Sequence, residues 1–198
     1  MPAAVVIPVK AFAAAKVRLA PALTPPERAA LARSMAEQVV AAAGTLPVTV
    51  VCDDPAVVEW AEDLGVAVAW TPGLGLDGAV EAGVDAVGRA GARRAIVAHA
   101  DLPLARDLAA LLPLGDEVVL VPDRHSDGTN VAVVPTAGGF RFAYGPGSFA
   151  RHVVEAERLG LTASVVRDPR LGWDVDRPAD LDLPSDAELL RAASPGCR

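Results

Sequence analysis

The sequence of 198 residues is poor in aromatic side chains, which make up 4% of it, and it has no excess of basic ones. Its 18 Lys and Arg are outnumbered by 25 Asp and Glu, which gives a net charge of −7. Binding to nucleic acid or to a membrane surface requires clustered cations, so the charge balance argues against both kinds of partner. Apolar residues still make up 52% of the chain, many of them alanine. This content excludes a disordered chain and predicts close packing of helices against a sheet.

Cysteine is also scarce, since only Cys52 and Cys197 are present. Two distant thiols do not make a disulfide framework, and this usage is typical of a cytoplasmic protein. There is no CxxC motif, and the three histidines lack the spacing of a zinc site. The longest uncharged stretch, residues 38–52, is shorter than the roughly 20 residues of a membrane helix. Basic residues follow the first apolar run instead of preceding it, which argues against a secretory signal.

Short apolar, mostly β-branched runs alternate with Ala- and Leu-rich stretches along the chain. The runs predict strands at residues 3–9, 48–52, 66–70, 95–98, 118–121, 130–134 and 163–167. The first five are almost wholly apolar, as expected of strands buried on both faces of a parallel sheet. The sequence therefore predicts an α/β fold, a three-layer sandwich around a mostly parallel sheet. We expect residues 1–193 to form one domain and residues 194–198 a frayed tail.

Helices are predicted between these strands, at residues 24–43, 55–64, 77–90, 104–112, 149–159 and 178–192. The first is the best marked. Thr24 and Glu27 have capping-box spacing, and Pro25 and Pro26 occupy the first helical positions. Gly44 then ends the helix.

Acidic side chains follow several predicted strands, at the edge where open α/β sheets bind their ligands. Asp101 comes after the fourth strand, while Asp174 and Asp176 are two residues apart and point the same way in an extended backbone. Three converging carboxylates are unfavourable without a cation, and Mg²⁺ is the natural one beside phosphate oxygens. The alternative is that Asp101 caps a turn and that the Asp-x-Asp pair is solvated.

Basic side chains collect after the first predicted strand, in a chain that is otherwise acidic. Lys10, Lys16 and Arg18 place three cations within nine residues. In a doubly wound sheet a nucleotide triphosphate would sit here, and Lys and Arg would neutralise its oxygens. Any single one can belong to a solvated loop, but three at this position favour the nucleotide.

Two loops carry small polar residues. Gly145-Pro-Gly-Ser148 precedes a predicted helix, where glycine lets backbone amides approach an anion and Ser148 can cap or bind. A plain helix start explains this loop equally well. Thr129 and Asn130 place a hydroxyl and an amide at the entrance to a strand, which by itself is a turn.

Asp53 and Asp54 follow the second predicted strand and could contact a nucleotide, although capping of the helix at Pro55 is the favoured interpretation. We identify no Walker A motif, no G-x-G-x-x-G motif and no GxSxG nucleophile elbow, so we expect no P-loop, no dinucleotide-binding loop and no serine-hydrolase site.

Taken together, the motifs occur in an order that is far more specific than any one of them. They are Ile7-Pro-Val-Lys10, Ala15-Lys16-Val-Arg18-Leu19, Ala100-Asp101-Leu-Pro103, Pro122-Asp123-Arg124, Gly128-Thr129-Asn130, Tyr144-Gly-Pro-Gly-Ser148-Phe149 with His152, and Asp174-Val-Asp176-Arg-Pro178 with Asp180-Leu181. Over about residues 5–183 the chain resembles the phospholactate and phosphoenolpyruvate guanylyltransferases that make the deazaflavin coenzyme F-420. The resemblance implies a Rossmann-like nucleotidyltransferase fold, related to the molybdopterin and sugar nucleotidyltransferases.

The resemblance also implies a reaction, in which GTP and a phosphorylated three-carbon acid give a guanosine-diphospho acid and pyrophosphate. It implies Mg²⁺ held by Asp101, Asp174 and Asp176. It implies contacts to the acid from Thr129, Gly145 and Ser148, with Asn130 beside them. It implies a triphosphate site and catalytic cations at Lys10, Lys16 and Arg18, and further nucleotide contacts at Gly75, Leu76 and Asp77. The family usually has Asn at the position of Asp77. The Asp77 carboxylate can accept a hydrogen bond from the nucleotide, but unlike Asn it cannot donate one.

Among the acids, we favour phosphoenolpyruvate for a bacterial member of the family, with 2-phospho-L-lactate as the other substrate. A second hypothesis is nucleotidyl transfer to a sugar phosphate or molybdopterin. Those enzymes use a glycine-rich loop after the first strand to bind the triphosphate, and the absence of glycine from residues 10–16 argues against this hypothesis. A third is a non-catalytic regulator that binds a nucleotide. The oligomeric state is left open, with a homodimer as one option.

Overall fold

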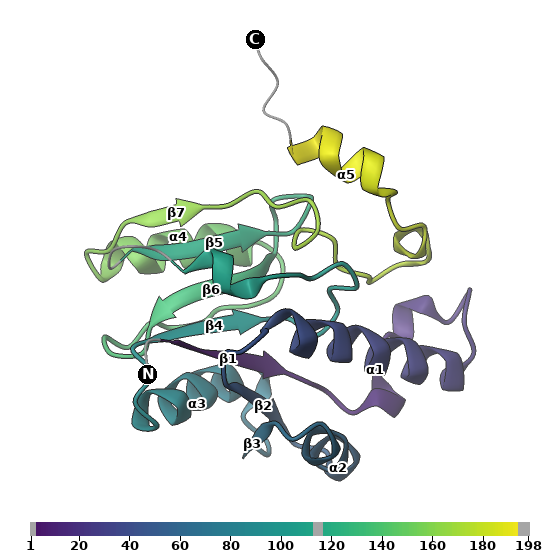
Figure 1. Ribbon diagram of the computed structural model, residues 1–198, viewed down its shortest axis with the longest axis horizontal. Coiled ribbons are helices and arrows are strands. Elements are labelled where there is room, and N and C mark those ends of the chain that lie inside the picture. Colours follow the sequence, from purple (N-terminus) through teal and green to yellow (C-terminus); the bar gives the residue numbers. More distant parts are fainter. Residues whose placement is uncertain (1–2, 113–116, 194–198) are drawn as a thin grey trace.

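A seven-stranded sheet forms the centre of the computed structural model, which describes residues 3–112 and 117–193 (Figure 1). The strands are β1 (Ala3–Pro8), β2 (Val48–Cys52), β3 (Ala67–Trp70), β4 (Arg94–Ala98), β5 (Val118–Pro122), β6 (Thr129–Pro135) and β7 (Ala163–Val165). They lie in the order β3-β2-β1-β4-β6-β5-β7. Only β6 runs antiparallel to its neighbours. The predicted α/β fold with a mostly parallel sheet is therefore confirmed.

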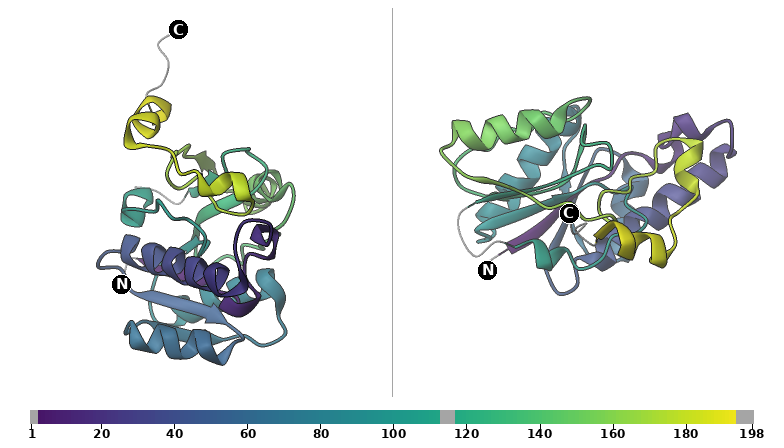
Figure 2. Two further views of the ribbon diagram at one scale, coloured as in Figure 1. Left: turned by 90° about the vertical axis from the view of Figure 1, so that its right-hand side faces the viewer. Right: turned by 90° about the horizontal axis from the view of Figure 1, so that it is seen from above.

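Helices cover both faces of this sheet (Figures 1 and 2). They are α1 (Pro25–Ala42), α2 (Pro55–Asp63), α3 (Gly75–Arg89), α4 (Ser148–Arg158) and α5 (Asp186–Ala193), with the 3₁₀ turns η1 (Phe12–Ala14), η2 (Val17–Leu19), η3 (Leu108–Leu111) and η4 (Pro178–Leu181). One hydrophobic core joins the sheet to α1 and α2 through residues such as Val39 and Trp60. The other joins it to α3 and α4 through residues such as Val80 and Ala156. Helix α5 lies apart from the sheet, and no helix of the described residues is long and apolar enough to cross a membrane.

The capping box predicted for the first helix is present, since a Glu27 carboxylate oxygen accepts from the Thr24 backbone amide at 2.7 Å. Two other predicted helices are wrong. The one over residues 104–112 is only the turn η3, preceded by Asp107 with a left-handed φ of +42°. The one over residues 178–192 is divided into η4 and α5, because Pro184 between them has no amide hydrogen and disfavours helix before it. Residues 194–198, expected to fray, lie outside the described residues.

Burial on both faces, expected of the first five strands, fails at β3. This strand forms the edge of the sheet, and Trp70 at its end is 51% exposed. The central strands β1 and β4 match the expectation, because almost all their side chains are buried. An apolar run alone does not distinguish a central strand from an edge strand.

Small residues let α3 approach the sheet closely, as the alanine-rich composition predicts. A Cβ added at Gly83 would lie 2.5 Å from a methyl of Val51 and 2.7 Å from a methyl of Val6. Both valines are fully buried in the sheet, so neither can move away without disturbing its neighbours.

We therefore expect Gly83→Ala to lower the free energy of unfolding by about 1–3 kcal/mol, as overpacked cores do. Urea unfolding measures this change. The control is Gly78→Ala in the same helix, where the nearest atom belongs to the half-exposed side chain of Leu74. The control should be neutral or slightly stabilising, because alanine favours helix. Equal stability of the two variants would contradict this account of the packing.

Candidate active site

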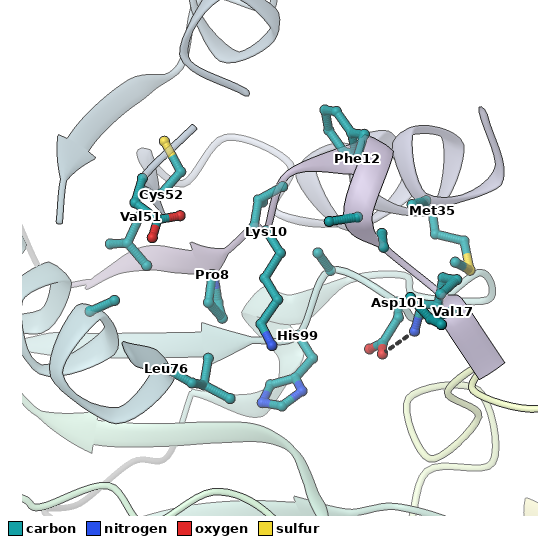
Figure 3. A pocket seen from close by; sticks show the side chains of 18 of the residues that line it. Pro8, Lys10, Phe12, Val17, Met35, Val51, Cys52, Leu76, His99 and Asp101 are labelled. Atoms are coloured by element: carbon teal, nitrogen blue, oxygen red, sulfur yellow. Dashed lines mark hydrogen bonds and ion pairs between the residues drawn. The ribbon is translucent and has the colours of Figure 1, made fainter. Parts of the chain in front are cut away.

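A pocket of about 570 Å³ opens at the carboxyl ends of β1, β2 and β4 (Figure 3). Strand β1 lies between β2 and β4, so the chain order reverses here, and such switch points are where open α/β sheets bind ligands. The volume is that of an ordinary small-molecule site, which is about 300–1,000 Å³. Of the residues predicted from the sequence, the pocket is lined by Lys10, Lys16, Arg18, Gly75, Leu76, Asp101 and Asp176.

At one end of the pocket, a lysine joins two of the predicted carboxylates. Lys16 Nζ donates to Asp101 Oδ2 at 2.6 Å and to Asp176 Oδ1 at 3.1 Å. Arg18 lies farther out, 3.4 Å from Asp176. The backbone amide of Val175 donates to the Asp101 carbonyl oxygen at 3.2 Å, which fixes the Asp174–Asp176 segment beside the end of β4. Residues far apart in the sequence thus meet at one point, as the strand topology predicts.

The charges of this cluster shift one another's protonation. Burial alone would lower the pKa of Lys16, but the Asp101 and Asp176 carboxylates outweigh it and raise that pKa. Burial alone would raise the pKa of Asp101, but the Lys16 charge outweighs it and lowers that pKa. Burial raises the pKa of Asp174, and the nearby Asp101 and Asp176 charges raise it further. The three carboxylates therefore repel one another, and the Lys16 ammonium compensates part of that repulsion.

The backbone at Lys16 is strained. Its φ of +54° lies in the left-handed region, which residues other than glycine rarely adopt. Such a conformation costs about 1–3 kcal/mol and persists only where the surroundings enforce it, often at functional sites. Here the strained residue is the one whose ammonium group bridges Asp101 and Asp176.

The described residues contain no group of three His, Cys, Asp or Glu side chains arranged to hold a metal ion. One observation nevertheless fits Mg²⁺. The Oδ1 atom of Asp101 is buried and has no hydrogen-bond partner. An unsatisfied buried oxygen is unfavourable, and carboxylate oxygens are the ligands that Mg²⁺ prefers. Asp101, Asp174 and Asp176 thus have the chemistry of a Mg²⁺ site, and the metal stays a prediction.

An arginine and an aspartate hold the segment that carries Asp174 and Asp176. Arg124 Nη1 donates to the Asp174 carbonyl at 3.0 Å, and its guanidinium lies 4.3 Å from the Trp173 ring centre. The same guanidinium forms an ion pair with Asp180, which is 5% exposed. Asp180 also accepts from two backbone amides, one of them that of Asp176 at 2.8 Å. This pair positions the acidic segment against the sheet.

Asp53, for which the sequence favours capping of the helix, lines the pocket directly after the end of β2. Its neighbour Asp54 caps α2, accepting from Ala56 N at 3.0 Å and Val57 N at 3.2 Å. The Asp53 side chain has no hydrogen-bond partner among the described residues, and Asp53 lines the pocket. Of the two acids, only one caps the helix, and the other is available to a ligand.

The loop that opens α3 shows that our expectation of no G-x-G-x-x-G motif is wrong. Gly73, Gly75 and Gly78 have G-x-G-x-x-G spacing between a strand and a helix, as in dinucleotide-binding sites. Gly73 and Gly75 have φ values of +72° and +66°, so the turn requires glycine at both. Gly75 and Leu76 line the pocket.

The predicted acid-binding residues form a second group outside the pocket lining. The Thr129 amide donates to Ser148 Oγ at 3.0 Å, and the Ser148 amide donates to the Gly145 carbonyl at 3.0 Å. Gly145 has a φ of +97°, a conformation that favours glycine. Thr129 and Ser148 are only 2% and 1% exposed.

Two predicted ligand-binding side chains are engaged with the protein itself. Asp77 Oδ1 accepts from the Tyr144 amide at 2.8 Å, which ties α3 to the loop before α4. An Asn could accept the same bond through its amide oxygen, so the departure of Asp77 from the family pattern preserves this contact. Asn130 Nδ2 donates to the Leu171 carbonyl at 2.9 Å and lies 3.5 Å from Asp174 Oδ1. Asn130 therefore connects the Thr129 strand to the acidic segment.

Comparison with known proteins agrees with this geometry. Residues 3–183 match the sequence model of the family described as "Guanylyl transferase CofC like". A phosphoenolpyruvate guanylyltransferase of Rubrobacter xylanophilus is 40% identical over 184 residues, covering 89% of this chain and 90% of that protein. This chain belongs to the CofC-like guanylyl transferase family.

A second relative and a solved structure are also similar to this chain. A 2-phospho-L-lactate guanylyltransferase of Methanothermobacter thermautotrophicus is 35% identical over 184 residues, covering 89% of this chain and 81% of that protein. The structure of a nucleotidyl transferase from the same organism superimposes with a TM-score of 0.65 at 15% identity, covering 91% of this chain and 94% of that one. This likeness supports the nucleotidyltransferase fold of the CofC-like chain.

The ion pair of Asp180 in this CofC-like protein leads to a pH-dependent prediction. Burial would raise the pKa of Asp180, but two backbone amides and Arg124 outweigh it and lower that pKa. A carboxyl with a lowered folded-state pKa stabilises the fold above its unfolded-state pKa of about 3.9, and this stabilisation is lost as the pH falls through the folded-state value. We expect Asp180→Asn to lower the free energy of unfolding by about 2 kcal/mol at neutral pH.

Urea unfolding at a series of pH values tests this expectation. The difference between the variant and the native protein should begin to shrink below about pH 4, and it should disappear once the pH has fallen through the lowered folded-state pKa of Asp180. The exposed neighbour Asp182 provides a matched control, and Asp182→Asn should change little at any pH. A deficit of Asp180→Asn that stayed constant down to acidic pH would contradict the ion-pair explanation.

Proposed function

We propose that this protein transfers the guanylyl group of GTP to phosphoenolpyruvate, giving a guanosine-diphospho acid and pyrophosphate, as in the assembly of coenzyme F-420. The observation that carries the proposal is the pocket at the strand switch point, in which Lys16 bridges Asp101 and Asp176. Family membership and the names of the relatives support it. We also expect a cytoplasmic location, and the homodimer considered above stays a prediction.

The basic side chains of the pocket supply the triphosphate site in this proposal. Lys10 extends into the pocket (Figure 3) and forms no ion pair with any described residue, so its charge is available to an anion. Lys16 and Arg18 lie on the acidic side. A triphosphate along this line of cations would place its α-phosphorus near the Asp101 end.

The chemistry requires no general base. An anionic oxygen of the acid's phosphate attacks the α-phosphorus of GTP, the bond from that phosphorus to the bridging oxygen breaks, and pyrophosphate leaves with the electron pair. Because the attacking oxygen is already ionised at neutral pH, the main barrier is repulsion between two anions. Lys10, Lys16 and Arg18 reduce that repulsion. A catalytic triad is therefore not required for this reaction.

Asp101, Asp174 and Asp176 would hold Mg²⁺, which when bound neutralises phosphate charge and orients an in-line displacement. The Lys16 ammonium neutralises the carboxylates in the structure described here, and its flexible stem allows it to turn from the carboxylates towards the triphosphate.

Pyrophosphate release tests the proposed function. The protein is incubated with GTP and Mg²⁺, together with either phosphoenolpyruvate or 2-phospho-L-lactate. We expect turnover with phosphoenolpyruvate, and we expect Asp101→Asn and Asp176→Asn to lower kcat by about a hundredfold or more. The control is Asp85→Asn, the same change at an exposed position of α3, which should keep native turnover.

Release with neither acid would contradict the proposal. Persisting GTP binding in a thermal-shift titration would then favour the regulator, while turnover with a sugar phosphate alone would favour the second hypothesis.

Selection of the base offers a separate prediction. Guanine presents N–H donors on its pairing edge that adenine arranges differently, and the carboxylate of Asp53 is an acceptor in the lining of the pocket with no hydrogen-bond partner among the described residues. We expect Asp53→Ala to reduce the preference for GTP over ATP in kcat/KM by about tenfold to a hundredfold, the equivalent of one charged hydrogen bond. The exposed Asp63 at the end of α2 supplies the control Asp63→Ala. An unchanged preference would remove Asp53 from base recognition.

A further inference from the structure

A buried histidine beside the predicted acid site has no part in the mechanism above. His152 in α4 is 0% exposed, and its ring packs against Phe140, Phe142 and Tyr144 at centroid distances of 5.1–5.8 Å. A histidine in such surroundings must satisfy both ring nitrogens within the protein. Its partners therefore reveal its protonation state.

The hydrogen bonds of His152 fix its tautomer. The backbone amide of Ala143 lies 3.0 Å from Nε2 and can only donate, so Nε2 is an unprotonated acceptor. The proton of the neutral ring is then on Nδ1, which lies 3.0 Å from Thr129 Oγ1. His152 Nδ1–H thus donates to the Thr129 hydroxyl.

The neutral form is also the one that the surroundings favour. Burial, with the nearby His99 and Arg151, lowers the pKa of His152 to about 4, although the Asp77 and Glu155 charges oppose this effect. The ring therefore keeps the same tautomer over the neutral pH range.

This tautomer determines what the two hydroxyls can do. Thr129 Oγ1 accepts from His152, and Ser148 Oγ accepts from the Thr129 amide at 3.0 Å. Neither hydroxyl donates to a described residue, although both side chains are nearly fully buried. Each therefore has a hydroxyl hydrogen without an acceptor. Two such donors, in one small volume, suit an anionic ligand.

We propose that His152 is a positioning residue, whose Nδ1–H occupies the Thr129 oxygen and so directs the Thr129 hydroxyl hydrogen towards the anionic groups of the phosphorylated acid. The inference rests on the proposed function, because Thr129 and Ser148 are assigned to the acid there. His152 itself touches no substrate. Its effect is to fix the direction of a donor before the acid arrives, which reduces the cost of ordering on binding.

A matched pair of variants tests the role. Asn places an amide nitrogen near the position of Nδ1, whereas Gln places an oxygen near that of Nε2. His152→Asn therefore keeps the donor to Thr129, and His152→Gln keeps only the acceptor for Ala143. We expect His152→Gln to raise KM for the acid about tenfold, with KM for GTP unchanged, and His152→Asn to stay near the native value.

A double-mutant cycle separates positioning from stability. Thr129→Val alone should raise KM for the acid, and adding His152→Gln should raise it no further, because the histidine acts through that hydroxyl. Val134→Ala, a buried truncation at the far end of β6, serves as the stability control and should lower Tm without changing KM for the acid.

The outcomes distinguish this inference from the function on which it rests. If the native protein releases no pyrophosphate with either acid, both fall. If the native protein does release pyrophosphate, two results would overturn the inference alone. One is the same KM for the acid in His152→Gln and His152→Asn. The other is that the effects of His152→Gln and Thr129→Val on this KM multiply, since His152 would then act independently of the Thr129 hydroxyl.

Discussion

The ion pairs of Lys16 with Asp101 and Asp176 are the interaction on which the site depends. They bring together residues from the segment after β1, the end of β4 and the loop before η4. Without a cation among them, the carboxylates would repel one another in a partly buried place. The strained backbone of Lys16 shows that the fold tolerates a local cost to keep the ammonium there.

Two sets of interactions hold the segment that carries Asp174 and Asp176 beside this cluster. Arg124 and Asp180 hold the acidic segment through its backbone, and Arg124 also lies 3.9 Å from a carboxylate oxygen of Asp174, while Asp176 lines the pocket. Asn130 links that segment to β6, whose first residue is Thr129. The cations that we propose bind the triphosphate and the buried hydroxyl pair thus belong to one connected structure, although only the cations line the pocket.

Much of this arrangement could be predicted from the sequence. Apolar periodicity places the strands, and the rule that ligands bind at the carboxyl ends of parallel strands brings Asp101 to the site. Thr129 and Asn130 obey a different rule, because β6 is antiparallel and presents its first residues at that edge. Strand direction depends on long-range pairing, which periodicity does not encode. The same limit explains the exposed edge strand β3. It also explains Asp53, since only the folded chain shows which of two adjacent acids caps α2 and which is left over.

The turn between β5 and β6 has a consequence for engineering substrate choice. Asp123 accepts three backbone amides of its own turn, and Asp127 receives the amides of Gly147 and Phe149 through its side chain and carbonyl. These hydrogen bonds therefore join the β5–β6 turn to the loop before α4. A larger acid at the site that we propose beside Thr129 and Ser148 would require both loops to be remodelled together, because a change in either one breaks hydrogen bonds to the other.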